Sequence, residues 1–131
     1  MSATNFLENE ILDHILGEGV RNFTPSTTLY IGLFTAVADG EAGSVTEVSG
    51  NGYARTALAF NASSSSACTN NGDVTFPAAS GGAWGTITHI GVYSAATTGD
   101  LYFVGSLSAS KTVDDGDIFQ ISDTNLSISM N

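Results

Sequence analysis

Residues 84–107, WGTITHIGVYSAATTGDLYFVGSL, decide the fold class. Two runs rich in β-branched and aromatic residues, 84–93 and 101–107, flank a short polar connection. The pair Thr98-Gly99 in that connection is typical of a tight turn between antiparallel strands. This stretch therefore predicts a β-hairpin.

Upstream, residues 28–36 (TLYIGLFTA) are apolar on both alternating faces, which predicts a central strand buried on both sides. An acidic, glycine-rich loop (39–52) and a polar connection of low complexity (61–71) separate further short strands. We expect these strands at 53–60, 74–76, 111–113, 118–121 and 126–130, with 118–121 paired to 126–130 across a loop at 122–125. Roughly eight short antiparallel strands predict an all-β sandwich or barrel, formed by one domain over residues 1–131.

The N-terminal segment, residues 1–19, is the exception, because its periodicity predicts an amphipathic helix. The apolar stripe consists of Leu7, Ile11, Leu12, Ile15 and Leu16. We expect Asn5 to cap the helix with Glu8 three residues later, and Gly17 or Gly19 to end it. Such a helix either covers its own sheet or docks on a neighbouring subunit, and we predict that it packs on its own domain.

The composition excludes several classes of function. The chain has 13 acidic and 3 basic residues and a net charge of -10, which argues against nucleic-acid and anionic-membrane partners. The N-terminus lacks the basic and apolar regions of a secretory signal, and no apolar run is long enough to span a bilayer. Cys68 is alone, so an internal disulfide is impossible. These features predict a protein that is made in a cytoplasm and is soluble there.

Few residues suggest chemistry. His14 and His89 have no Cys, His or acidic residue at zinc spacing, so each is interpreted as a structural histidine. The serines at 63–66 are typical of a loop, and no serine lies in a Gly-x-Ser-x-Gly elbow. The sequence therefore predicts no nucleophilic triad.

The acidic run Asp114-Asp115-Gly116-Asp117 has three interpretations. A solvated turn is preferred, calcium binding is the alternative, and paired carboxylates for acid/base catalysis are the third. Four strand aromatics, Trp84, Tyr93, Tyr102 and Phe103, are interpreted as core side chains, with a sugar-binding shelf as the alternative. The sequence thus predicts no enzyme, and no catalytic, cofactor-binding or metal-binding residues.

Several stretches of the chain, taken in order, resemble one family of small tailed-phage virion proteins. They are NFLENEILDHILG, TLYIGLFTA, EVSGNGYAR, VTFPAAS, AWGTITHIGVYSAATTGDLYFVGSL and SASKTVDDGDIF, and they cover nearly the whole chain. Members of this family are often labelled tail fibre proteins, and similar proteins can also serve as capsid decoration, or cement, subunits. The family has no catalytic motif, so the resemblance implies no functional residues.

The resemblance implies a structural subunit of the virion that assembles with itself, which we expect to be a homotrimer. A capsid decoration subunit contacting the major capsid protein is the first interpretation, since the chain lacks the fibrous repeat of a long shaft. A tail-associated fibre or baseplate subunit is the second, with loop 61–71 meeting a host glycan or protein. A hydrolase of host polysaccharide, acting through Asp114 and Asp117, is the third.

Overall fold

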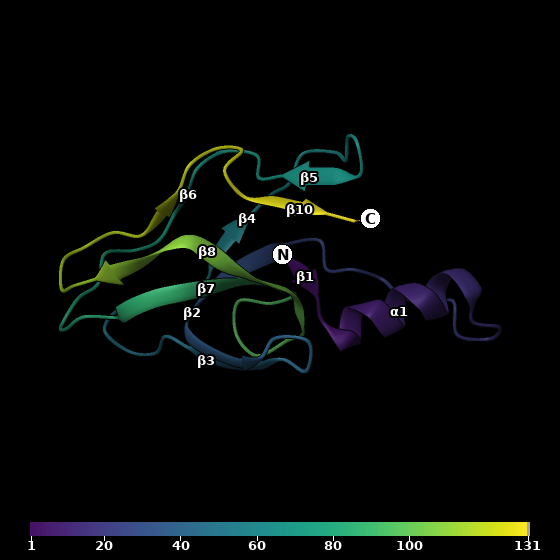
Figure 1. The fold of residues 1–131 in the computed structure, drawn as a ribbon, viewed down its shortest axis with the longest axis horizontal. Coiled ribbons are helices and arrows are strands. Elements are labelled where there is room, and N and C mark those ends of the chain that lie inside the picture. The colour runs from purple at the N-terminus through teal and green to yellow at the C-terminus, as the bar shows by residue number, and fades with distance from the viewer. Residues whose placement is uncertain (131) are drawn as a thin grey trace.

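The computed structural model describes residues 1–130, which contain one helix and ten strands (Figure 1). The predicted domain, 1–131, extends one residue beyond this range. The elements in chain order are β1 (Ser2–Ala3), α1 (Asn5–Leu16), β2 (Leu29–Asp39), β3 (Ser44–Glu47), β4 (Thr56–Leu58), β5 (Ala67–Thr69), β6 (Val74–Thr75), β7 (Gly85–Tyr93), β8 (Leu101–Val113), β9 (Gln120–Ile121) and β10 (Ser127–Ser129). The prediction of an all-β fold with one N-terminal helix is confirmed.

The main sheet has six strands in the order β1-β8-β7-β2-β3, and β4 pairs with the other end of the same β2 edge. All its pairs are antiparallel, and Leu33 lies opposite Ile90 where β2 meets β7. Both of these side chains are buried on one face of the sheet, and Phe34 is buried on the other. β2 is therefore a central strand with two buried faces, as its sequence predicted.

Two small sheets, β5–β10 and β6–β9, lie over one face of the main sheet (Figure 1). The main core fills the space between these layers. It combines side chains of β2 and β7 with Val74 of β6, Ile128 of β10, and Phe76 and Phe119 from the adjoining loops. The hairpin between β7 and β8 turns at Thr98 and Gly99, both of which have positive φ angles. This confirms the turn that the dipeptide predicted.

The predicted pairing of 118–121 with 126–130 is wrong. β9 pairs with β6, whereas β10 pairs with β5, so the two segments join different sheets. The reason lies in Asn70, whose side chain is fully buried inside the turn that connects them. Its amide nitrogen donates to the carbonyl of Ser122, and its Oδ1 accepts from the backbone N–H of Leu126. These bonds tie the connecting turn to the residue after β5, and the two strands on either side of the turn pair with different partners.

Other predicted boundaries also need correction. The loop 39–52 contains β3, and the polar connection 61–71 contains β5, because edge pairing with β2 and β10 overrides weak local propensity. Residues 111–113 are not a separate strand but the end of β8, which carries an irregularity between its pairings with Ile87 and His89. The strand predicted at 53–60 is reduced to β4.

The helix begins one residue earlier than predicted. Thr4, not Asn5, is the N-cap, and its hydroxyl accepts from the N–H of Leu7. The same hydroxyl donates to the carbonyl of Leu101 at 2.6 Å, so a tertiary contact selects the cap. Gly17 ends the helix, as expected.

The prediction that the domain covers the helix is wrong for the C-terminal half of α1. Leu7 is buried against the sheet and Ile11 is half-buried, but Leu12, Ile15 and Leu16 are exposed. The physical reason is geometric: α1 follows directly on β1 at one end of the sheet, so its later turns extend past the strands (Figure 1). Those turns therefore have no sheet beneath them.

Candidate functional site

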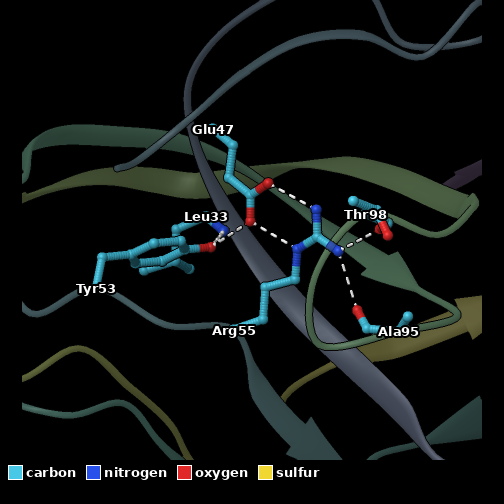
Figure 2. Close-up of polar contacts among 6 residues, drawn as sticks. All are labelled: Leu33, Glu47, Tyr53, Arg55, Ala95 and Thr98. Atoms are coloured by element: carbon cyan, nitrogen blue, oxygen red, sulfur yellow. Dashed lines mark hydrogen bonds and ion pairs between the residues drawn. The ribbon is translucent and has the colours of Figure 1, made fainter. Parts of the chain in front are cut away.

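A cluster of polar side chains lies beside β2 and β3, centred on Arg55 (Figure 2). Glu47 at the end of β3 receives two hydrogen bonds from the guanidinium: Nε donates to Oε1 and Nη2 donates to Oε2, each at 2.8 Å. Tyr53 donates to the same Oε1 at 2.7 Å and accepts from the N–H of Leu33. The ion pair is well shielded from water, since the side chains of Arg55 and Glu47 are 9% and 22% exposed.

The remaining guanidinium nitrogen holds the β7–β8 hairpin. Nη1 of Arg55 donates to the carbonyls of Ala95 and Thr98, at 2.9 and 2.7 Å (Figure 2). Gly32 permits this arrangement, because a Cβ there would lie 2.8 Å from the ring of Tyr93 and 3.0 Å from Oε1 of Glu47. One arginine thus links β3 and the segment before β4 to a loop about 40 residues away.

Three side chains of this cluster keep their protons near neutral pH. Burial raises the pKa of Tyr53 far above the ordinary tyrosine range, with Glu47 adding to the shift. Burial also raises the pKa of Tyr93, to about 12. Burial lowers the pKa of Arg55, but the hydrogen bond and charge of Glu47 outweigh it, so the pKa is raised overall. Since these three groups stay protonated, the arrangement is suited to holding the fold together.

Sequence reasoning missed this cluster. A signal was present: Arg55 is one of only three basic residues, and it ends the conspicuous stretch SGNGYAR. The partner carboxylate and the carbonyls of the hairpin loop are set by tertiary structure, however, and no local pattern points to them.

The structure keeps the two histidines apart. His14 is exposed on α1. His89 is half-buried in β7, where its Nδ1 lies 2.8 Å from the hydroxyl of Thr88. Within residues 1–130, no group of three or more His, Cys, Asp or Glu side chains could hold a metal ion.

The acidic run forms a tight, exposed turn. Oδ2 of Asp117 accepts from the N–H of Asp114 at 3.0 Å, and the carbonyl of Asp114 accepts from the N–H of Asp117 at 3.0 Å. Gly116 adopts a positive φ angle of 89° in the turn. One of the three carboxylates therefore stabilises its own turn, which is the solvated-turn interpretation of the sequence.

The other sequence candidates lie in separate places. The serines at 63–66 are exposed in a turn before β5, where Ser64 and Ala67 form a bridge. Three of the four aromatics are buried, Trp84 at 6%, Tyr93 at 7% and Tyr102 at 6% exposure, so they cannot form a shelf for sugars. Cys68 is half-buried in β5.

Two surface hollows differ in the chemistry of their lining residues. One, of about 710 Å³, lies between β8 and residues 117–125, and its only charged lining residues are Lys111 and Asp117. Another, of about 380 Å³, lies between α1 and β8 and is lined mainly by apolar side chains, among them Ile11, Ile15 and Phe103. The second is continuous with the uncovered part of the helix, because Ile15 belongs to both.

Exposed apolar side chains gather at this end of the molecule. Of seven large apolar residues exposed within residues 1–130, five belong to α1 or the loop after it: Phe6, Leu12, Ile15, Leu16 and Val20. We name Leu12, Ile15 and Leu16 the exposed helix face. A concentration of this kind marks an interaction surface more often than scattered apolar residues do. It is the candidate site that the structure supports best.

The helix described within residues 1–130, α1, is not long and apolar enough to cross a membrane.

Comparisons with known proteins complete the picture. A search of curated proteins found no match. The family model described as podophage GP4 fiber I protein gp80 matches residues 2–129, which covers all ten strands and the helix. A match over nearly the entire chain agrees with the resemblance to tailed-phage virion proteins. The chain therefore belongs to the podophage GP4 fiber I protein gp80 family and is a structural protein of the phage virion.

Proposed function

We propose that this chain is a non-enzymatic, fibre-type subunit of the virion that acts through contacts with its own copies and with neighbouring virion proteins. The observation that carries the proposal is the exposed helix face, on a chain whose matching family carries the name of a fibre protein. Apolar side chains that are 55–68% exposed in the single chain gain stability when another surface covers them.

The capsid decoration subunit, which the sequence placed first, is the second candidate. The observation in its favour is the small two-layered β fold, which suits a knob on a shell better than a long shaft (Figure 1). The family name favours the fibre subunit, which is therefore the first candidate.

Copy number separates the two positions. Quantitative mass spectrometry of purified virions would measure this chain against the major capsid protein, and gold-labelled antibody would locate it by electron microscopy. A few to a few dozen copies with label on the tail support the fibre assignment. Hundreds of copies spread over the shell overturn it in favour of decoration.

The non-enzymatic part is supported by the chemistry of the described residues. In the polar cluster around Arg55 the side chains of Tyr53, Glu47 and Arg55 are hydrogen-bonded to one another, and Tyr53 and Tyr93 keep their protons near neutral pH. Incubating the purified protein with host surface polysaccharide tests this. We expect no new reducing ends, and turnover that disappears in Asp114→Asn or Asp117→Asn would overturn the proposal.

A further inference from the structure

No part of residues 1–130 covers the exposed helix face, and an apolar face of this kind is stabilised when another surface packs on it. Leu12, Ile15 and Leu16 are 55%, 62% and 68% exposed. Helices of about 12–15 residues or fewer are marginal in water unless an apolar face is packed. α1 has 12 residues, of which Leu7 alone is buried. Its last two turns therefore need an external surface to be stable.

The charges around the face are unevenly placed. With about 3.6 residues per turn, Leu12, Ile15 and Leu16 share one side of the helix, and Glu10 and Asp13 lie on the opposite half. Glu8 is the acidic residue that falls on the same side, one turn before Leu12. At the other end Arg21, the sole basic residue before Arg55, places Nη2 3.4 Å from the carbonyl of Leu16. The face thus runs from a negative end, through an apolar middle, to a positive end.

Such a surface is complementary to itself only in one orientation. Two copies of α1 laid side by side in opposite directions, with Leu12 against Leu12, bring residue 8 of each chain opposite residue 16 of the other. Glu8 then meets the partner's Arg21 at both ends, while the apolar side chains meet in the middle. In a parallel pair Glu8 would lie beside Glu8, which is repulsive.

We propose that the exposed helix face is a self-association site, where α1 of a second copy docks antiparallel about a two-fold axis near Leu12. A two-fold contact between identical patches is the commonest arrangement in homo-oligomers. The groove between α1 and β8 adjoins this contact through Ile15, so the partner helix also covers apolar surface at its rim. This self-association site rests on the proposed function, which expects the chain to assemble with its own copies. The site adds to that function the surface involved and the orientation of the two helices.

The first experiment is sedimentation equilibrium of the full chain and of the double variant Leu12→Glu/Leu16→Glu. We expect the wild type to form dimers through this face, rather than the homotrimer that the resemblance implied, and the variant to remain monomeric. Both side chains are exposed in the single chain, so the melting temperature of the monomer should be retained. The matched control is Ile118→Glu, which changes a residue that is 58% exposed elsewhere and should leave the association intact. A monomeric wild type, or a double variant that associates normally, overturns the inference.

The orientation has its own test. Glu8→Arg and Arg21→Glu each remove both symmetry-related ion pairs of the dimer. At about 0.5 kcal/mol for each rim pair, each variant should weaken the dimer by about fivefold in Kd, and the double exchange should restore it. In a Cys68→Ala background, Leu12→Cys should form a disulfide-linked dimer on oxidation, whereas Ile118→Cys should not. If the dimer of the double-exchange variant is weaker than the dimers of both single variants, the antiparallel arrangement is overturned.

These outcomes are distinct from those that test the proposed function. If the chain is found on the tail but Leu12→Glu/Leu16→Glu self-associates normally, only this inference fails. If the chain dimerises as described but is found spread over the capsid shell, the fibre assignment fails and the docking site stands.

Discussion

The guanidinium carbon of Arg55 lies 3.4 Å from the centre of the Tyr93 ring. This cation–π contact comes in addition to the paired hydrogen bonds with Glu47. The guanidinium therefore binds a carboxylate through its N–H groups and contacts an aromatic ring with its face. Tyr93 ends β7, and the arginine also binds the loop that follows. The hairpin on which the fold class was predicted is therefore anchored by a side chain far away in the sequence.

Removing Arg55 should destabilise the fold strongly. Arg55→Ala leaves the carboxylate of Glu47 shielded and unpaired, which typically costs about 3–5 kcal/mol. Arg55→Lys should recover little, because an ammonium cannot bind the carboxylate through two nitrogens and reach two carbonyls as well. Urea unfolding followed by circular dichroism measures both.

Lys111→Ala is the matched control, since Lys111 is exposed and its loss should change the unfolding free energy by less than about 0.5 kcal/mol. The double change Glu47→Gln/Arg55→Met should cost less than the sum of its parts, as expected for contacting groups. Equal losses from Arg55→Ala and Lys111→Ala would contradict the structural role of the cluster.

Stability should fall in alkali through the buried tyrosines. The pKa of Tyr93 is raised from 10.0 to about 12, and that of Tyr53 is raised further, in each case first through burial. Above pH 10 the unfolded chain releases phenolic protons that the folded chain retains, so the unfolded state binds fewer protons. The free energy of unfolding then decreases as pH rises from about 10 to 12. Urea unfolding across this range tests the slope.

Tyr93→Phe should flatten the dependence, whereas Tyr30→Phe, which changes a tyrosine outside the hydrogen bonds around Arg55, serves as the control. Ultraviolet absorbance of phenolate gives an independent readout. A wild-type protein whose stability is constant up to pH 12 would refute the account.

Asn70 should be indispensable despite its place in a polar, low-complexity stretch. Asn70→Ala removes the groups that bind Gly72, Ser122 and Leu126 in a fully buried position. Unsatisfied buried groups cost about 1–3 kcal/mol each, so a loss of about 3 kcal/mol is expected in thermal or urea unfolding. The neighbouring Asn71→Ala changes an exposed side chain and should have little effect. Similar small losses at both positions would show that the turn holds without the amide.

The acidic turn should behave as a turn and not as a metal site. Asp117→Asn weakens the bond from the N–H of Asp114 and should cost about 1 kcal/mol, whereas the exposed Asp115→Asn should be neutral. Differential scanning fluorimetry measures both variants, and we expect EDTA to leave the melting temperature of the wild type unchanged. A fall of many degrees that calcium reverses would establish a calcium site instead.

The sequence predicted best where burial imposes a pattern. β2, β7 and the hairpin into β8 have strong alternating or two-faced apolar runs, and the turn at Thr98 and Gly99 has the residue types that positive φ angles favour. In such segments local preference and tertiary packing agree, so the pattern is visible without the partner strands.

Prediction failed where pairing depends on distant groups. β5, β9 and β10 are two or three residues long, which is too short for a period to be recognised. The partners of β9 and β10 follow from the amide of Asn70, and the cap of α1 follows from the contact between Thr4 and Leu101. The exposed helix face was visible as an apolar stripe, but whether the sheet reaches beneath it depends on the position of β1.

The antiparallel pairing of β1 with β8 has a consequence for biosynthesis. Ser2 and Ala3 lie opposite Val104 and Phe103. In the same way β5 pairs with β10, which lies about 60 residues later in the chain, at residues 127–129. During translation β1 therefore cannot pair until β8, about 100 residues further along the chain, has been made. Such distant contacts slow folding. A nascent chain interrupted before residue 127 lacks the partner of β5, so premature termination should yield polypeptides that cellular proteases remove before they can compete for places in a particle.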